Sequence, residues 1–128
     1  MKTRILLLVI IPCVLFFSCQ TGIRKEKHVL VYTKNGVGFI HECIPASVEM
    51  LKKIGEENGI IVDVSEDPSV FTEENLGKYS ALIFSNTNND IFNTNEQKIA
   101  FVRYIQAGGG FVGIHSACGS ERDRKSVV

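Results

Sequence analysis

The sequence predicts an α/β protein built on a doubly wound parallel sheet. Short apolar segments alternate with amphipathic segments of helical periodicity, and this order is typical of parallel strands joined by helical crossovers. The apolar segments are also nearly continuous, as in strands that are covered on both faces. Polar residues follow three of them, at Thr33, Ser85 and His115. We therefore expect these three residues at one edge of the sheet, where open α/β sheets bind their ligands.

Four strands are predicted, and helices connect them. The strands span residues 29–32, 60–64, 81–84 and 111–114. Pro45 suits the first turn of the first helix, and Gly59 suits its end. This helix carries Val48, Leu51 and Ile54 at threefold spacing, which predicts one apolar face.

Two further helices are predicted from their capping residues. Thr72 is suited to cap a short helix, with Phe71 and Leu76 placed to form its hydrophobic staple. Thr94 and Gln97 have the spacing of a capping box. They predict the start of a longer helix that runs to residue 107.

The first 18 residues are typical of an export signal. A short basic start is followed by the apolar residues 5–17, a run too short to span a bilayer but suited to the hydrophobic region of a signal. Cys19 closes the run and resembles the lipidated cysteine of bacterial lipoproteins. We therefore expect cleavage before Cys19, a lipid anchor on it and a tether over residues 19–27. Aspartate directly after the lipidated cysteine is associated with retention in the inner membrane. Gln20 stands at this position instead, which favours the periplasm-facing outer membrane. An ordinary secretory signal is the alternative.

Charge and cysteine content exclude some partners. Without Lys2 and Arg4, the chain has 12 basic against 14 acidic residues. No basic patch results, so a nucleic-acid partner is not expected. Outside the leader and its cleavage site, Cys43 and Cys118 remain; their spacing fits no zinc motif and no cofactor is evident. In an oxidising compartment the two thiols can pair, and buried free thiols are the alternative.

The glycine-led segment over residues 108–117 is the most informative part of the chain. Gly108 ends the preceding helix, a strand follows, and His115 and Ser116 form its polar tip. Folds of this kind place a nucleophile on such a strand-to-helix elbow. Here histidine stands at the position of the nucleophile.

Several segments together resemble the ThuA-like (trehalose utilisation) family, whose fold is similar to that of class I glutamine amidotransferases and to flavodoxin-like sheets. The segments occur in the expected order, as residues 29–34, 38–41, 44–45, 71–76, 84–87 with Asp90, and 108–117. The resemblance covers residues 28–118. It implies a role in carbohydrate metabolism and a carbohydrate partner.

The resemblance also limits the chemistry. Amidotransferases carry a catalytic cysteine at the elbow, where this chain has His115, so cysteine-dependent glutamine hydrolysis is not expected. Cys118 lies three residues beyond, inside the predicted following helix. The chain departs from its relatives at Ile40, where arginine is frequent, and at Asn89, where glycine is usual. These departures argue against an anion clamp in the first loop.

His115 is the candidate catalytic residue, as a general base or as a ligand to a sugar hydroxyl or a metal; shaping the elbow is the alternative. His41 follows the first strand and is a candidate substrate-binding residue that should approach His115. With Glu42 or Asp90, the two histidines would form a metal site. An exposed loop histidine is the alternative for His41.

Asn86 and Thr87 complete the candidate substrate-binding residues. Both side chains can bond a sugar hydroxyl, and both are common in turns. Ser116 is expected to cap the following helix rather than to act as a nucleophile.

The last ten residues do not fit the pattern. Residues 119–128 are a charged tail without an apolar face, and residues 123–128 match the translation of a common sequencing adapter. We expect adapter read-through there, with a genuinely short gene as the alternative. The chain would then hold about the N-terminal half of the domain, its sheet incomplete and its fourth strand exposed at one edge.

The expected function is binding or processing of a carbohydrate in the bacterial envelope. A non-catalytic sugar-binding module is one alternative. An amidotransferase-like hydrolase whose nucleophile lies outside this chain is the other.

Overall fold

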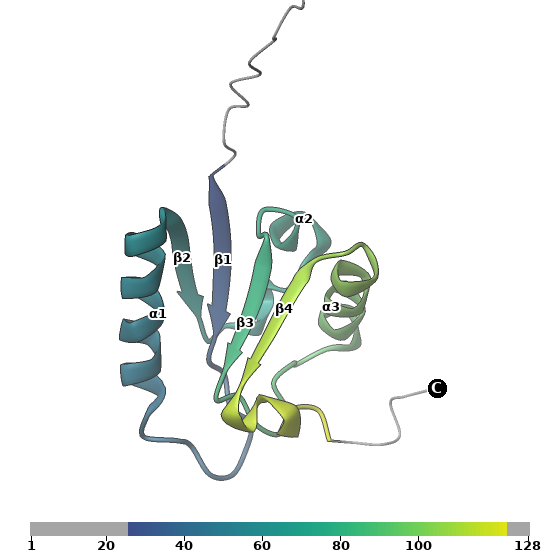
Figure 1. The fold of residues 1–128 in the computed structure, drawn as a ribbon. Coiled ribbons are helices and arrows are strands. Elements are labelled where there is room, and N and C mark those ends of the chain that lie inside the picture. Colours follow the sequence, from purple (N-terminus) through teal and green to yellow (C-terminus); the bar gives the residue numbers. More distant parts are fainter. Residues whose placement is uncertain (1–25, 123–128) are drawn as a thin grey trace, which may run out of the picture.

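The computed structural model describes residues 26–122 and contains a sheet of four parallel strands (Figure 1). The strands are β1 (Lys27–Tyr32), β2 (Ile60–Ser65), β3 (Ala81–Ser85) and β4 (Gly110–Ile114), in the order β2-β1-β3-β4. The helices are α1 (Ile44–Asn58), α2 (Glu73–Leu76) and α3 (Asn95–Gln106), with short 3-10 turns η1 (Pro68–Val70) and η2 (His115–Gly119). The predicted α/β fold class is confirmed.

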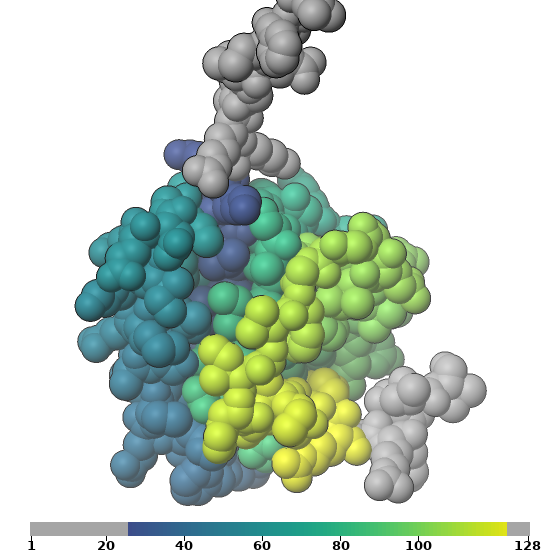
Figure 2. Space-filling model, viewed as in Figure 1, coloured from purple at the N-terminus to yellow at the C-terminus, as the bar shows by residue number. Residues whose placement is uncertain are grey.

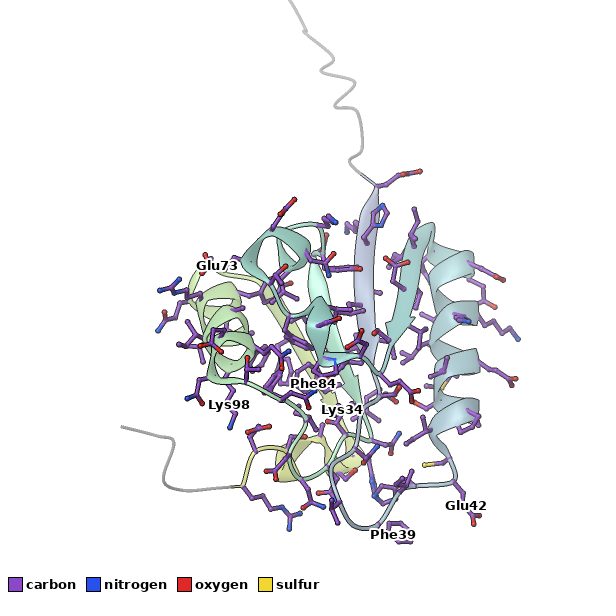
Figure 3. All side chains as sticks on the ribbon, turned by 180° about the vertical axis from the view of Figure 1, so that it is seen from behind. Lys34, Phe39, Glu42, Glu73, Phe84 and Lys98 are labelled. Atoms are coloured by element: carbon purple, nitrogen blue, oxygen red, sulfur yellow. The ribbon has the colours of Figure 1, made fainter. Side chains whose placement is uncertain are left out.

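The helices lie on both faces of the sheet, with α1 on one face and α2 and α3 on the other (Figures 1 and 3). Across the sheet, the chain first steps from β1 to its neighbour β2 on one side. It then crosses to β3 on the other side of β1 and continues outward to β4. Because parallel crossovers are right-handed, this reversal places the connecting helices on opposite faces.

The predicted helix ends are confirmed. The Thr94 side chain accepts a hydrogen bond from the backbone N–H of Gln97, and the Gln97 side chain bonds back to the backbone of Thr94. The Thr72 side chain caps α2 by accepting a hydrogen bond from the backbone N–H of Asn75. Gly59 and Gly108 follow α1 and α3 with φ angles of 63° and 90°, the left-handed region that glycine adopts at little cost.

An aromatic cluster fills the space between the sheet and α2 and α3. Tyr32 is completely buried at its centre, and its ring lies 4.7 Å from that of Phe71 and 5.5 Å from that of Phe84. Its hydroxyl donates a hydrogen bond to the carbonyl of Ile91 at 2.6 Å. Burial raises the pKa of Tyr32 well above its ordinary value, and the charges of Asp67 and Glu121 add to the increase. The hydroxyl therefore stays a proton donor inside the core.

β4 forms one edge of the sheet, as the sequence predicts, and no helix covers its front face (Figure 2). The strand contains no charged residue, and Phe111 and Val112, whose side chains point to opposite faces, are each 47% exposed. Within residues 26–122, no helix is long and apolar enough to cross a membrane.

Candidate functional site

The carboxyl ends of the strands form the candidate site. The register pairs Tyr32 with Phe84 and Ser85 with Ile114, so β1, β3 and β4 end close together. Thr33, Ser85 and His115 therefore lie at one edge, as predicted. The strand order reverses between β1 and β3, and such a reversal marks the ligand-binding crevice of doubly wound sheets.

Two histidines from separate loops meet at this edge. The ring centroids of His41 and His115 are 4.5 Å apart, and the rings meet edge to face at 86°. Phe39 packs on the other side of His41 at 4.9 Å and projects from the end of the loop (Figure 3). His115 is exposed and His41 is half-buried. The predicted approach of His41 to His115 is thus present, and His41 is not the freely exposed loop residue of the alternative.

His115 occupies a strained turn. It follows β4 directly and has a φ angle of 53°, a left-handed conformation that costs about 1–2 kcal/mol for a residue with a Cβ atom. Asn86, Asn89 and Glu121 share this conformation at the same edge. Strain of this kind clusters at functional sites. Asparagine tolerates the φ angle of 57° at Asn89 better than most residues with a Cβ atom, because its short polar side chain can form local hydrogen bonds.

Asn86 and Thr87 have internal partners. Their exposed fractions are 2% and 0%. Asn86 accepts a bond from the thiol of Cys43 at 3.6 Å and donates one to Ser85 at 3.2 Å, whereas Thr87 shares a 2.8 Å hydroxyl bond with Ser120. These bonds join the loop after β3 to its neighbours. Direct contact of Asn86 or Thr87 with a sugar stays a prediction.

The structure contradicts the expected helix cap at Ser116 and the expected burial of Cys43 and Cys118. Ser116 does not cap a helix, because the 3-10 turn η2 already begins at His115 and places Ser116 inside the turn. Its buried hydroxyl has no hydrogen-bond partner among the described residues. Cys43 and Cys118 are free and exposed rather than buried. The Cys118 thiol bonds to the His115 carbonyl at 3.7 Å, so it lies within the turn and not at the elbow.

The predicted metal constellation does not form. Within residues 26–122, no three histidine, cysteine, aspartate or glutamate side chains come together as metal ligands. Glu42 projects away from the body of the protein (Figure 3), and both Glu42 and Asp90 are exposed. The histidine pair is therefore without a carboxylate ligand in this part of the chain.

Sequence reasoning missed the contacts made by Gly119 to Arg122. Oε1 of Glu121 accepts hydrogen bonds from the backbone N–H groups of Ile91 at 2.8 Å and Phe92 at 3.0 Å, and Oε2 lies 2.6 Å from Nζ of Lys98. Desolvation acts to raise the pKa of Glu121, but the bond to Lys98, the two backbone bonds and the Lys98 charge outweigh it and lower the pKa. Because this contact is polar, apolar periodicity gave no signal for it.

Residues 1–25 and 123–128 lie outside the described residues. The predictions of a signal, of lipidation at Cys19 and of adapter read-through therefore concern parts of the chain that the structure does not describe.

The fold and its carboxyl edge define a doubly wound α/β protein with a histidine at the elbow after its fourth strand. The sequence model of the ThuA family, described as trehalose utilisation, matches residues 28–127. The chain belongs to this family.

A solved structure supports the same assignment. It is that of a ThuA-like protein from Bacteroides uniformis ATCC 8492, which is 25% identical in sequence with a TM-score of 0.59. The match covers 77% of this chain and 40% of that chain, so this chain spans less than half the length of its structural relative. No curated protein matches.

Proposed function

We propose that the carboxyl edge of this ThuA-like domain binds or processes a carbohydrate, with His115 as the reacting or hydrogen-bonding group. The contact between His41 and His115 carries the proposal, because it joins two loops at the edge where such folds bind ligands. The family description, trehalose utilisation, supports the substrate class.

His115 is suited to act on a hydroxyl group. An imidazole can accept a proton from a sugar hydroxyl or donate a hydrogen bond to it, and the exposed ring of His115 is accessible to such a ligand. His41 packs against the ring and restricts its rotation. In this role His41 positions His115 and forms part of the binding surface.

One observation favours a non-catalytic sugar-binding module as the second candidate. Among residues 26–122, no side chain forms a hydrogen bond with the imidazole of His41 or His115. General bases are usually oriented by a third group, and that group is not found in this part of the chain. Binding requires no such orientation.

Titration of the full chain with a panel of neutral sugars, including trehalose, tests the proposal. We expect binding that His115→Ala weakens by about tenfold or more, as for loss of a ligand hydrogen bond. His28→Ala is the matched control, since His28 lies at the opposite end of β1. Turnover abolished by His115→Ala would establish catalysis, whereas binding without turnover would establish the module. If no sugar in the panel binds, the carbohydrate proposal fails.

The envelope location is a separate proposal that rests on the sequence around Cys19. We propose that the mature chain is lipid-anchored through Cys19. Expression in a bacterial host should place the protein in the membrane fraction, and Cys19→Ala should release it or leave it unprocessed. Equal membrane retention of both forms would contradict lipidation at this residue.

A further inference from the structure

A groove lies on the side of the 33–43 loop that faces β2. It has a volume of about 660 Å³ and lies between this loop, the first turn of α1 and Glu66 after β2. Ligand sites are commonly clefts of about 300–1,000 Å³, so the groove has room for one or two sugar rings.

Loop contacts bridge the crevice between β1 and β3 at residues 36–37 and 88–90. The N–H of Gly36 donates to the carbonyl of Asn88 at 2.8 Å, and Nδ2 of Asn89 donates to the carbonyl of Val37 at 2.9 Å. A Cβ atom at Gly36 would lie 2.5 Å from the backbone nitrogen of Asp90. The two loops therefore pack too closely to admit a ring between them.

The lining of the groove combines an apolar surface with hydrogen-bond acceptors. Ile40, Ile44 and Pro45 supply the apolar part, and Glu66 supplies a carboxylate. A sugar ring has the matching composition, because its C–H face is apolar and its hydroxyls donate to carboxylate oxygens. His41 also lines the groove and contacts His115, so the groove adjoins the histidine pair.

The charge of the lining favours a neutral ligand. Lys34 is the cationic side chain among the lining residues, and its Nζ already donates to Oδ1 of Asn93. The Glu66 carboxylate, beside an ammonium group that is already hydrogen-bonded, opposes a phosphate or carboxylate on the ligand. Ile40, which is 61% exposed, adds apolar surface and no positive charge to the lining, so it does not attract an anionic ligand.

From these observations we infer that the groove is a subsite for a neutral, hydroxyl-bearing sugar ring and that it discriminates against phosphorylated sugars. The inference rests on the proposed function. It adds the residues that would bind the ring and the expectation that the ligand is uncharged. Glu66 accepts hydrogen bonds from the sugar hydroxyls, Ile40 packs on the C–H face, and His41 links this subsite to His115.

Equilibrium binding of the full chain to glucose, trehalose and their 6-phosphates tests the inference. The neutral sugar should bind more tightly than its phosphate, and Glu66→Gln should weaken its binding about fivefold. Glu57→Gln, on the exposed end of α1, is the matched control and should leave binding unchanged. Ile40→Arg should shift the preference toward the phosphate. Val37→Arg, in the same loop but outside the groove lining, should not.

The outcomes separate this inference from the proposed function. If binding is lost in His115→Ala but unchanged in Glu66→Gln and Ile40→Arg, the groove is not the subsite and the proposed function stands. If the sugar phosphate binds as tightly as the neutral sugar, the inference that the groove prefers a neutral ligand is overturned. If neither sugar nor phosphate binds at all, the proposed function and the inference fall together.

Discussion

Removal of the Glu121 carboxylate should destabilise the protein and loosen the candidate site. Glu121→Ala leaves the backbone N–H groups of Ile91 and Phe92 without their acceptor in a segment where both residues are buried. An unpaired buried donor costs about 1–3 kcal/mol. The pair with Lys98 is partly exposed, with 32% of the Lys98 and 19% of the Glu121 side chain accessible, and adds about 0.5–1 kcal/mol. With both donors unpaired and the Lys98 pair lost, we expect a total loss of about 2.5–7 kcal/mol.

Glu121→Gln separates these contributions. The amide oxygen can still accept from the two N–H groups, whereas the charge opposite Lys98 is lost, so we expect a loss of about 1 kcal/mol. Urea unfolding of the wild type and both variants, monitored by circular dichroism, measures the free energy of unfolding. If Glu121→Ala costs no more than Glu121→Gln, the backbone bonds do not stabilise the fold and the reasoning is refuted.

The same residue predicts a dependence of stability on pH. The pKa of Glu121 is lower in the folded protein than its ordinary value. Its contribution is therefore complete above the ordinary glutamate pKa and is lost as the pH falls through the lowered folded value. The difference in stability between wild type and Glu121→Gln should shrink on acidification. A difference that stays constant or grows at low pH would contradict the assignment.

Three further predictions concern the core, a helix end and the sheet edge. Phe71→Ala, in the aromatic cluster, should cost about 3–5 kcal/mol in urea unfolding; a loss below about 1 kcal/mol would be inconsistent with its burial. Gly108→Ala should cost about 1–2 kcal/mol through its φ angle of 90°, since nothing lies within 4 Å of the added Cβ atom; unchanged stability would argue against that conformation. We expect the exposed edge of β4 to pair with a second copy of the chain, so Val112→Lys should reduce self-association in analytical ultracentrifugation; undiminished association would contradict pairing through β4.

Local features of the fold could be predicted from sequence because short-range chemistry determines them. The capping box of Thr94 and Gln97 and the cap at Thr72 involve residues three positions apart. The strands follow from their apolar runs, and their common direction follows from the helical crossovers. This direction sufficed to place His41 and His115 at the same edge.

The detailed site could not be predicted because it depends on contacts between distant loops. From the sequence, Asn86 and Thr87 fit a sugar contact and a turn equally well, but in the fold both are buried and bonded to Cys43 and Ser120. The role of Glu121 depends on backbone N–H groups about 30 positions earlier in the chain. A pattern of side chains in the sequence does not predict which backbone groups a distant carboxylate will contact. For Ser116, the early start of the 3-10 turn overrode the expected cap.

The parallel direction of the strands gives the molecule two opposite poles. β1 starts at Lys27 at one pole, and the histidine pair lies beyond the carboxyl ends of the strands at the other (Figure 1). Residues 19–26 can extend at most about 26–29 Å, so an acyl chain on Cys19 would hold the first pole toward the bilayer. Together, the proposed anchor and the proposed site would turn the binding surface away from the bilayer. The carbohydrate would then arrive from the aqueous compartment rather than from the lipid surface.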